Sequence, residues 1–299
     1  MTDSKLDYQR NVVLNTGNPM PLLGYGTYQI PNSPEGKQMV EEALRVGYRL
    51  LDCASFYHNE ETIGDAISNT TRAELYVVSK VWNDAIYQGK EAVRASCMES
   101  IRKLKCGYLD LFLIHWPVPG KHVEAYRELE RLREEGLVRD IGISNYTIED
   151  IRVLLDSGVR VMPAVNQIEI NPFLHRKVTL EYMRSLGILP MSYRGLRNAT
   201  GTTDPIVGDI ATSLNVTPAQ VLGRWLVQQQ ICHIPKSSKP ERIKSNADIF
   251  SFCLSQEQMK TLADLTTKDN LLLFKEHYLS RIVRNTPLPF SEGVNMTVE

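Results

Sequence analysis

Short apolar runs alternate with amphipathic stretches along most of the chain. The apolar runs predict buried strands, because strands covered on both faces consist almost entirely of apolar residues. The stretches between them repeat apolar positions with the helical period. One clear stripe, within residues 90–105, consists of Val93, Cys97, Ile101 and Leu104. The pattern predicts eight strands, over residues 22–27, 48–53, 75–81, 109–116, 139–144, 162–170, 188–193 and 231–237.

Helices are expected between these strands and after the last of them. A strand that alternates with a helix runs parallel to its neighbour, because such a crossover needs a dozen or more residues. Eight units in about 240 residues favour an α/β fold of the (β/α)8 TIM-barrel type over an open doubly wound sheet. The absence of GxGxxG after the first strand also argues against a Rossmann domain. The helices are expected over 36–46, 60–67, 90–105, 122–135, 148–155, 177–186, 205–214, 218–228, 240–247 and 255–265.

The two ends of the chain fall outside this repeating pattern. Near the amino end, two short apolar runs flank Asn15, Gly17 and Asn18, which is typical of a β-hairpin because Asn and Gly tolerate positive φ. We expect this hairpin to cap the bottom of the barrel. No linker divides the chain, so we expect one domain over residues 1–299 with the barrel at about 22–265. Residues 266–299 are expected to form an ordered tail over the active-site face, with a partly disordered tail as the alternative.

Composition mainly excludes partners. The chain has 34 basic and 35 acidic side chains, so its formal net charge of −1 gives no reason to expect nucleic acid or an anionic membrane as partner. It lacks the apolar core of a signal peptide and any run of about 18 apolar residues, so we expect a cytoplasmic protein. Five scattered cysteines without CxxC pairing favour reduced, mostly buried thiols over zinc ligands or disulfides. We expect a monomer without metal.

Titratable side chains stand at the carboxyl ends of three predicted strands. Asp52 ends the second strand and Tyr57 lies in the loop after it, while Lys80 and His115 lie near the ends of the third and fourth. Chemistry in parallel barrels sits just past these strand ends, and neighbouring strands lie about 4.8 Å apart. We therefore expect the four side chains to share a pocket. The simpler alternatives are a structural ion pair, a satisfied core histidine and a packing tyrosine.

Several segments together resemble the aldo-keto reductase superfamily, over about residues 12 to 265. They are PLLGYGTYQI, YRLLDCASFYHNE, LYVVSKVWN, LDLFLIHWP, GLVRDIGISNY, PAVNQIEINP and IPKSSKPERIKSN, in this order along the chain. One such segment is a weak match, but the full ordered set is a specific one. The resemblance implies a metal-free enzyme that transfers hydride from a nicotinamide cofactor to a small aldehyde or ketone.

The resemblance implies that Asp52, Tyr57, Lys80 and His115 are catalytic, with Tyr57 as the proton donor. A phenol titrates near pH ~10 in water, so we expect the Lys80 ammonium to lower the pKa of Tyr57. Asp52 would hold that ammonium in place and keep it charged. His115 would donate to the carbonyl oxygen as negative charge develops there. The substrate-binding residues implied are Tyr28, Trp82, His115 and Trp116, although Trp82 and Trp116 also suit an ordinary aromatic core.

The resemblance also implies a cofactor site, mostly in the second half of the chain. The residues implied are Gly26, Thr27, Tyr28, Asp52, Ser144, Asn145, Gln167, Tyr193, Arg194, Leu196, Lys236, Ser237, Ser238, Arg242 and Asn246, with Asn166 beside Gln167. Basic side chains and hydroxyls at a helix start suit the extra phosphate of NADPH, which is favoured over NADH. The alternatives are a simple turn at Gly26, strand-end capping by Ser and Asn, and a solvated basic helix start.

The chain departs from the family after Tyr193. Ser-Pro-Leu-Gly is usual there, whereas this chain has Arg194, Gly195, Leu196 and Arg197. We expect altered pyrophosphate contacts, with the Arg194 guanidinium replacing lost hydroxyls. Ser245 likewise stands where a carboxylate or amide is common. The loop after Trp116 is short, which favours an open pocket.

Three functions are consistent with these observations. NADPH-dependent reduction of aldehydes and ketones to alcohols is the first. The second is an NADP(H)-binding barrel with weak catalysis that serves as a structural or regulatory protein, which the altered residues 194–197 leave open. The third is an aldolase that uses Lys80 as a Schiff base, which does not account for the phosphate site.

Overall fold

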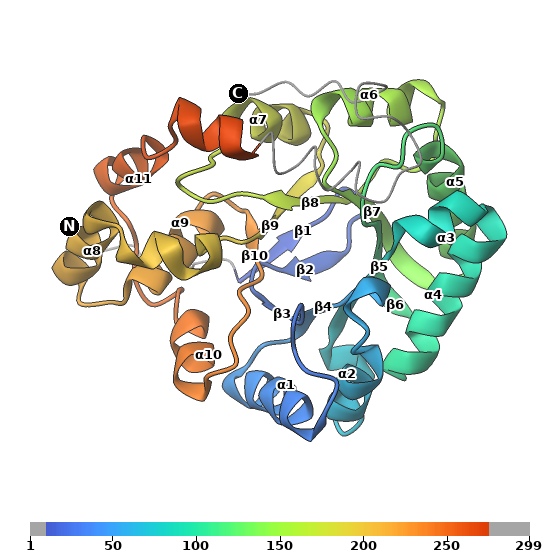
Figure 1. Ribbon diagram of the computed structural model, residues 1–299, viewed down its shortest axis with the longest axis horizontal. Helices are drawn as coiled ribbons and strands as arrows, with labels where there is room; N and C mark the ends of the chain where they lie inside the picture. The colour runs from blue at the N-terminus through green and yellow to red at the C-terminus, as the bar shows by residue number, and fades with distance from the viewer. Residues whose placement is uncertain (1–9, 275–299) are drawn as a thin grey trace.

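Eight parallel strands form a barrel in the computed structural model, which describes residues 10–274 (Figure 1). In barrel order they are β3 (Gly24–Gly26), β4 (Leu50–Asp52), β5 (Tyr76–Val81), β6 (Leu109–Ile114), β7 (Val138–Ser144), β8 (Val165–Glu169), β9 (Leu189–Tyr193) and β10 (Cys232–His233). The amide of His233 donates to the carbonyl of Leu22 over 2.8 Å, and Leu23 bridges in parallel to His233. The last strand thus returns to the first, and the predicted (β/α)8 barrel is confirmed.

Helices surround the strands in a ring (Figure 1). They are α1 (Pro34–Val46), α2 (Glu60–Ile67), α3 (Asn83–Gln88), α4 (Lys90–Leu104), α5 (His122–Glu134), α6 (Ile148–Asp156), α7 (Lys177–Ser185), α8 (Pro205–Leu214), α9 (Pro218–Val227), α10 (Pro240–Ala247) and α11 (Gln256–Ala263). Their bounds lie close to the predicted ones, except that α3 was not predicted. Its sequence, NDAIYQ, is too short to show an apolar stripe. None of the helices among residues 10–274 is long and apolar enough to cross a membrane.

Alternation along the strands divides the core into two layers. In β6, Leu111 and Leu113 belong to the cluster inside the barrel, whereas Phe112 and Ile114 belong to the cluster between the sheet and the helices. Successive strand residues point to opposite faces, so this period of two is expected. The predicted strand over 231–237 is shorter than expected because Pro235 has no amide to donate. All five cysteines are free, and four are buried.

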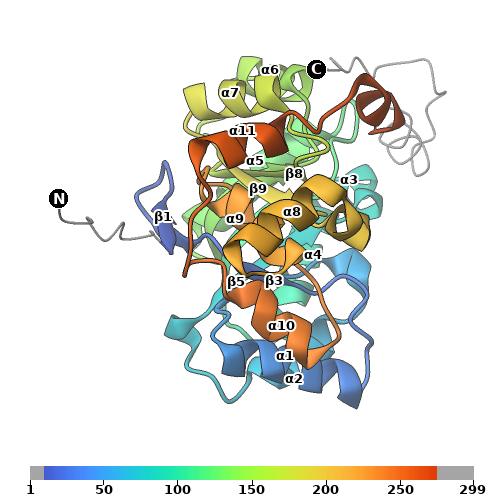
Figure 2. The same cartoon turned by 90° about the vertical axis from the view of Figure 1, so that its left-hand side faces the viewer.

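The predicted hairpin cap is confirmed. Strands β1 (Asn11–Val13) and β2 (Pro19–Pro21) pair in antiparallel fashion, at the end of the barrel opposite the segment that follows α11 (Figure 2). Leu14, Met20 and Leu22 are buried and belong to the same apolar cluster as the residues inside the barrel. The hairpin therefore plugs the barrel as well as covering it.

A charge cluster lies at the same end, on the strand starts. Asp110 accepts hydrogen bonds from Arg72 at 2.6 Å, from Arg139 at 3.1 Å and from the amide of Val77 at 2.8 Å. Both guanidinium groups also lie over the ring of Tyr108, 3.8 and 4.3 Å from its centroid. Both cations are thus fixed by a buried carboxylate and an aromatic ring.

The first part of the predicted tail is attached beside β8. Thr266 donates its hydroxyl to the carbonyl of Pro172 over 2.9 Å and accepts the amide of His175 over 2.8 Å. Arg197 donates to the side chain of Asn270 at 3.0 Å, in a helical turn that begins at residue 268. The remainder of the expected tail, residues 275–299, lies outside the described residues.

Candidate active site

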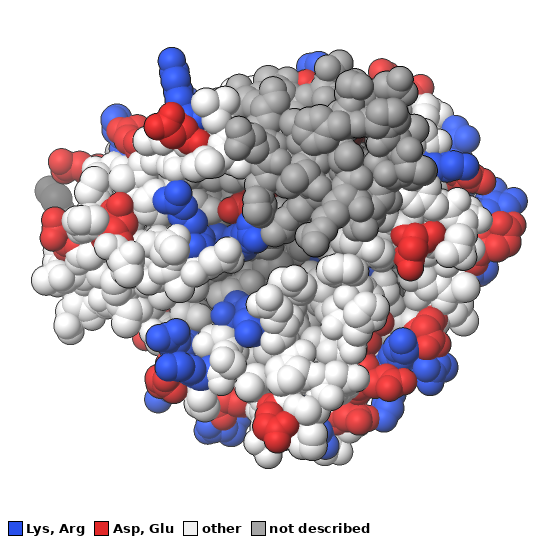
Figure 3. All heavy atoms as spheres, in the orientation of Figure 1, with Lys and Arg blue, Asp and Glu red and all other residues white. Residues whose placement is uncertain are grey.

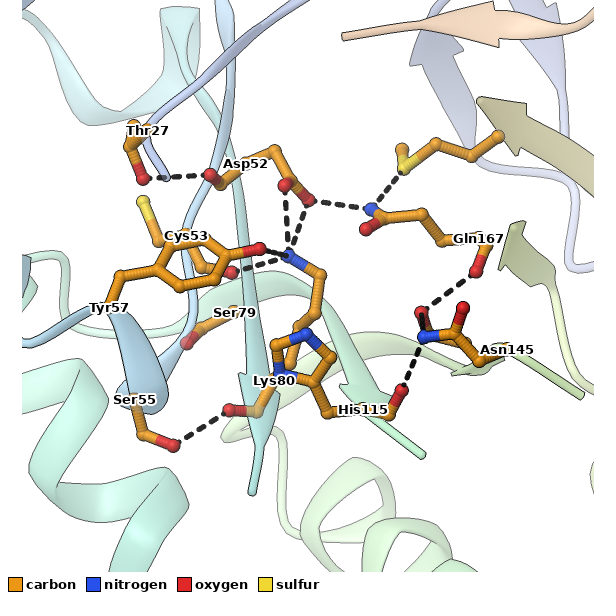
Figure 4. Close-up of polar contacts among 12 residues, drawn as sticks. Thr27, Asp52, Cys53, Ser55, Tyr57, Ser79, Lys80, His115, Asn145 and Gln167 are labelled. Atoms are coloured by element: carbon orange, nitrogen blue, oxygen red, sulfur yellow. Dashed lines mark hydrogen bonds and ion pairs between the residues drawn. The ribbon is translucent and has the colours of Figure 1, made fainter. Parts of the chain in front are cut away.

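The ammonium of Lys80 lies at the centre of a buried polar cluster (Figure 4). It is 2.8 and 2.9 Å from the two carboxylate oxygens of Asp52, and it donates to the carbonyl of Cys53 over 2.8 Å. It also lies 3.3 Å from the hydroxyl of Tyr57. Lys80 is fully buried and Asp52 nearly so. A buried ammonium needs such partners, because burial alone favours loss of its proton.

Strand register brings these side chains together. Asp52 pairs with Val78, two residues before Lys80, and Lys80 pairs with Leu113, two residues before His115. A spacing of two keeps all of these side chains on the inner face of the barrel. The predicted catalytic side chains therefore follow one another along β4, β5 and β6, and the structure brings these strand ends together as expected.

A short turn places Tyr57 over this cluster. Residues Ser55–Tyr57 form one turn of 3-10 helix, and Ser55 donates its hydroxyl to the carbonyl of Lys80 over 3.0 Å. His58 ends the turn in the left-handed conformation, with φ of 55°. The ring of Tyr57 meets the ring of His115 edge to face at 5.8 Å. The turn thus fixes the phenol between the lysine and the histidine.

The pKa of Tyr57 moves in the direction opposite to the prediction. Burial raises this pKa well above its ordinary value, and the negative charge of Asp52 raises it further. The Lys80 charge does not offset these two effects, because both Asp52 oxygens are within 2.9 Å of its ammonium while the phenol oxygen is 3.3 Å away. Asp52 neutralises most of the lysine's effect. The phenol therefore keeps its proton at neutral pH, as a proton donor must.

His115 is neutral and has a free ring nitrogen. Its side chain is buried, and Nδ1 has no hydrogen-bond partner among residues 10–274. Burial lowers the pKa of His115 well below its ordinary value, and the Lys80 charge lowers it further. Asn145 holds the main chain here by donating its amide to the carbonyl of His115 over 3.0 Å. A neutral imidazole at this place can still donate one N–H.

Aromatic rings line the site on the side of β5. Trp82 stacks on Phe56 with ring centroids 3.8 Å apart and meets His115 edge to face at 4.8 Å. Tyr28, which is half exposed, lies 5.0 Å from the ring of Tyr57. Phe56 was missed in the sequence, where the only sign was an apolar residue directly before Tyr57 in an otherwise polar loop. The list of predicted substrate residues also includes Trp116, which is buried, and its contact with substrate stays a prediction.

A second network connects the predicted nicotinamide residues to the catalytic cluster. Tyr193 donates its hydroxyl to Asn145 over 2.7 Å, and Ser144 donates to the carbonyl of Gln167 over 2.8 Å. Gln167 in turn donates its amide to Asp52 over 2.7 Å. The ends of β7, β8 and β9 are thereby tied to the same carboxylate that holds Lys80.

Asn166 does not belong to this network. Its amide donates to the carbonyl of Tyr146 over 3.1 Å and lies 3.7 Å from the sulfur of Met183 in α7. Because neighbouring strand residues point to opposite faces, Gln167 faces the barrel and Asn166 faces the helices. The sequence expectation that both residues face a ligand is corrected by this alternation.

Packing by itself requires a glycine at position 26. Its amide donates to the carbonyl of Pro235 over 3.0 Å, and a Cβ atom at this position would lie 2.9 Å from the carbonyl oxygen of Ile234. Only glycine permits so close an approach of two main chains. The next residue, Thr27, donates its hydroxyl to the carbonyl of Asp52 over 2.8 Å. Cofactor contacts of Gly26 and Thr27 stay predictions.

The predicted phosphate site contains cations without counter-ions. Lys236 and Arg242 are exposed, and neither forms an ion pair with any residue in the described range 10–274. Partial burial lowers the pKa of Lys236. Tyr25 fixes the main chain between them by donating its hydroxyl to the carbonyl of Ser237 over 2.6 Å. Lys and Arg side chains border the hollow in the middle of this face (Figure 3), so the site suits an anion.

Other residues of the predicted phosphate site differ in exposure. Ser238 is exposed, whereas Asn246, near the end of α10, is buried. Ser245 contacts the hydroxyl of Thr217 at 3.3 Å. Contacts of these side chains with a cofactor stay predictions.

Arg194 already has a partner. Its Nη1 lies 3.2 Å from a carboxylate oxygen of Glu169, which the sequence analysis did not consider. The following glycine is required by packing, because a Cβ at Gly195 would lie 2.6 Å from Leu226 and 2.8 Å from the His233 ring. Leu196 is half-buried. The proposed replacement of hydroxyl contacts by Arg194 therefore involves a guanidinium that a carboxylate also holds.

Fold and site together define a barrel enzyme of the oxidoreductase class. A model of the aldo/keto reductase family matches residues 22–266, and the chain belongs to that family.

Individual relatives cover most of the chain. It is 42% identical over 265 residues to an aldo-keto reductase of Mycobacterium sp. (strain JLS), covering 87% of this chain and 94% of that protein. It is 39% identical over 260 residues to the glyoxal reductase of Bacillus subtilis (strain 168), covering 86% and 93%. A variant of Gox0644 solved in complex with NADPH is similar at a TM-score of 0.83 and 35% identity, covering 87% of this chain and 94% of that one.

Proposed function

We propose that this protein reduces small aldehydes and ketones to alcohols with NADPH, in a reversible reaction without metal. The observation that carries the proposal is the position of Tyr57, whose hydroxyl lies 3.3 Å from an ammonium that Asp52 holds in place. The neutral ring of His115 stands beside it. These are a proton donor, a charge that stabilises the resulting phenolate, and a hydrogen-bond donor for a carbonyl oxygen.

Each group has one task in this reaction. Tyr57 gives its proton to the carbonyl oxygen, and Lys80 stabilises the phenolate that remains. Asp52 keeps Lys80 charged through two short contacts. His115 donates its N–H to the carbonyl oxygen and orients the substrate, because its neutral form does not compete for the proton. NADPH, when bound, supplies the hydride.

The residues present fit this cofactor. Lys236 and Arg242 offer two cations that have no carboxylate partner within residues 10–274, which suits the 2′-phosphate that distinguishes NADPH from NADH. Asn145, Gln167 and Tyr193 would hold the nicotinamide end, beside the catalytic cluster to which they are bonded. The similar structure solved with NADPH supports the same cofactor.

The proposed substrates are short carbonyl compounds. Phe56 and Trp82 form a flat apolar wall next to His115, and the half-exposed ring of Tyr28 lies 5.0 Å from the ring of Tyr57. Such walls exclude water and pack against a planar carbonyl group. The similarity to a glyoxal reductase points to short dicarbonyl compounds such as glyoxal.

Loss of NADPH absorbance with glyoxal and with an aromatic aldehyde tests the proposal. Wild type should turn over, and Tyr57→Phe should lose about 10³-fold in kcat while binding NADP+ as before, because one proton donor supplies about 10² to 10⁴ in rate. Tyr108→Phe, at the other end of the barrel, is the matched control and should keep full activity. A wild type that binds NADP+ without turnover would support the weakly catalytic barrel and reject the reductase.

A further inference from the structure

An ion pair at the barrel mouth is not used by the reaction above. Arg194 follows β9 directly and adopts the left-handed conformation, with φ of 52°. Its carbonyl accepts the amide of Arg197 over 2.7 Å and the side chain of Asn171 over 3.2 Å, so the main chain is fixed. Its guanidinium lies 3.2 Å from Glu169, whose side chain is only 14% exposed.

The strand order places this pair between the two halves of the predicted cofactor site. Gln167, which belongs to the catalytic network, lies on β8, and Lys236 follows β10. Arg194 follows β9, which pairs with both of these strands. A dinucleotide that reaches from the catalytic cluster to Lys236 has its two bridging phosphates in between. Those phosphates would therefore be the part of a bound cofactor nearest to Arg194.

We propose that Glu169 controls the affinity for the cofactor by sharing the Arg194 guanidinium with the bridging phosphates; this rests on the proposed function. Glu169 holds the guanidinium at 3.2 Å beside the ends of β8 and β9, so the position of Arg194 is already restricted before an anion binds. Its carboxylate also repels that anion, because the two negative charges share one partly buried cation. Glu169 is thus a positioning residue that weakens cofactor binding and speeds cofactor release.

The proposal separates two kinds of charge effect. The bridging phosphates are common to NADP+ and NAD+, so changes at Glu169 should alter the affinity for both by the same factor. Lys236 and Arg242 face the 2′-phosphate in the proposed function, so changes there should affect NADP+ alone. This contrast identifies which part of the cofactor each cation meets.

Calorimetric titration of the purified proteins with NADP+ and with NAD+ tests this. In Glu169→Gln the Kd for both should fall about three- to tenfold, and the gain should shrink at high salt. Glu169→Ala should shift the Kd in the same direction, which guards against an effect specific to glutamine. In Arg194→Ser the Kd for both should rise about tenfold. Glu134→Gln removes an exposed ion pair with Arg160, of 2.8 Å, and should leave both values unchanged.

An unchanged or higher Kd in both Glu169 variants, at unchanged melting temperature, would overturn the proposal. A gain for NADP+ alone would also overturn it, because the pair would then act on the 2′-phosphate. Failure of the proposed function would look different, since wild type would then either bind NADP+ without turnover or bind neither NADP+ nor NAD+, whatever the Glu169 variants do.

Discussion

The two ends of the barrel both contain a buried carboxylate beside a cation, yet the other groups that each cation contacts are different. At the hairpin end, Asp110 is shared by Arg72 and Arg139, and both cations also contact Tyr108. At the other end, the Lys80 ammonium reaches beyond its carboxylate to a phenol. An ion pair by itself therefore does not identify an active site. The feature that marks the candidate active site is a hydroxyl, that of Tyr57, beside the cation of the ion pair.

The same contrast holds for the surrounding charges. At the hairpin end both arginines of the cluster form ion pairs with Asp110. Lys236 and Arg242 at the mouth, in contrast, have no carboxylate partner among residues 10–274. His115 also keeps a buried Nδ1 without a partner in that range. Unmatched polar groups destabilise a protein unless a ligand satisfies them. The unpaired cations at the mouth therefore suit an anionic ligand, whereas the arginines at the hairpin end are already paired with Asp110.

Removing Lys80 should have the largest effect on both activity and stability. In Lys80→Met we expect kcat to fall by about 10³-fold, because Tyr57 loses the charge that stabilises its phenolate. Unfolding free energy should also fall by about 3–5 kcal/mol, because Asp52 is left as an unpaired buried charge. NADPH absorbance and denaturant unfolding measure the two effects. A variant that keeps wild-type kcat would refute the assignment of the site.

Arg72→Met is the counterpart at the hairpin end. Arg72 donates to Asp110 and to the carbonyls of Cys106, Leu75 and Tyr108, so its loss should lower the unfolding free energy by about 3 kcal/mol. The kcat of the folded fraction should stay within about twofold of wild type. Arg139→Met, which leaves Arg72 in place, should cost less. A large loss of kcat without loss of stability would mean that the two ends do not differ as described.

Acid should lower the stability of the folded protein through His122, which lies at the start of α5. Burial lowers the pKa of His122 to about 4, and the ring contacts the hydroxyl of the buried Tyr146 at 3.2 Å. A folded pKa below the unfolded value of about 6.5 means that stability is complete above pH ~6.5 and decreases as pH falls towards 4. Protonation of His122 then lowers the free energy of unfolding by up to about 3 kcal/mol.

The measurement for His122 is the slope of unfolding free energy against pH between pH 6.5 and 4. Other buried histidines contribute to this slope, so the informative quantity is the difference between wild type and His122→Gln. The variant should have the shallower slope whatever its absolute stability. Equal slopes would show that this histidine titrates normally in the folded protein.

The smallest expected effect concerns cofactor choice. In Lys236→Ala the Kd for NADP+ should rise about tenfold, or about 1.4 kcal/mol, while the Kd for NAD+ stays the same. Lys239→Ala, a neighbouring exposed lysine, serves as control. A parallel loss for both cofactors would place Lys236 at the bridging phosphates and shift the proposed 2′-phosphate contact to Arg242.

The barrel could be predicted from the sequence because buried parallel strands are nearly all apolar and alternate with amphipathic helices. The meeting of the four candidate catalytic residues could be predicted because three of them stand at or near the ends of strands that are neighbours in a barrel. The pairing of Arg194 with Glu169 could not, because it joins residues 25 positions apart whose side-chain directions the sequence does not give. The direction of the Tyr57 pKa shift depends first on how deeply the phenol is buried, which the sequence does not give. The stacking of Phe56 on Trp82 likewise depends on the turn between two strands.

The hairpin plug has one more consequence. Leu14, Met20 and Leu22 pack into one end of the barrel, so a ligand reaches the candidate site from the opposite end. If a cofactor and a substrate approach from this one side, the molecule that lies deeper has to bind first and leave last.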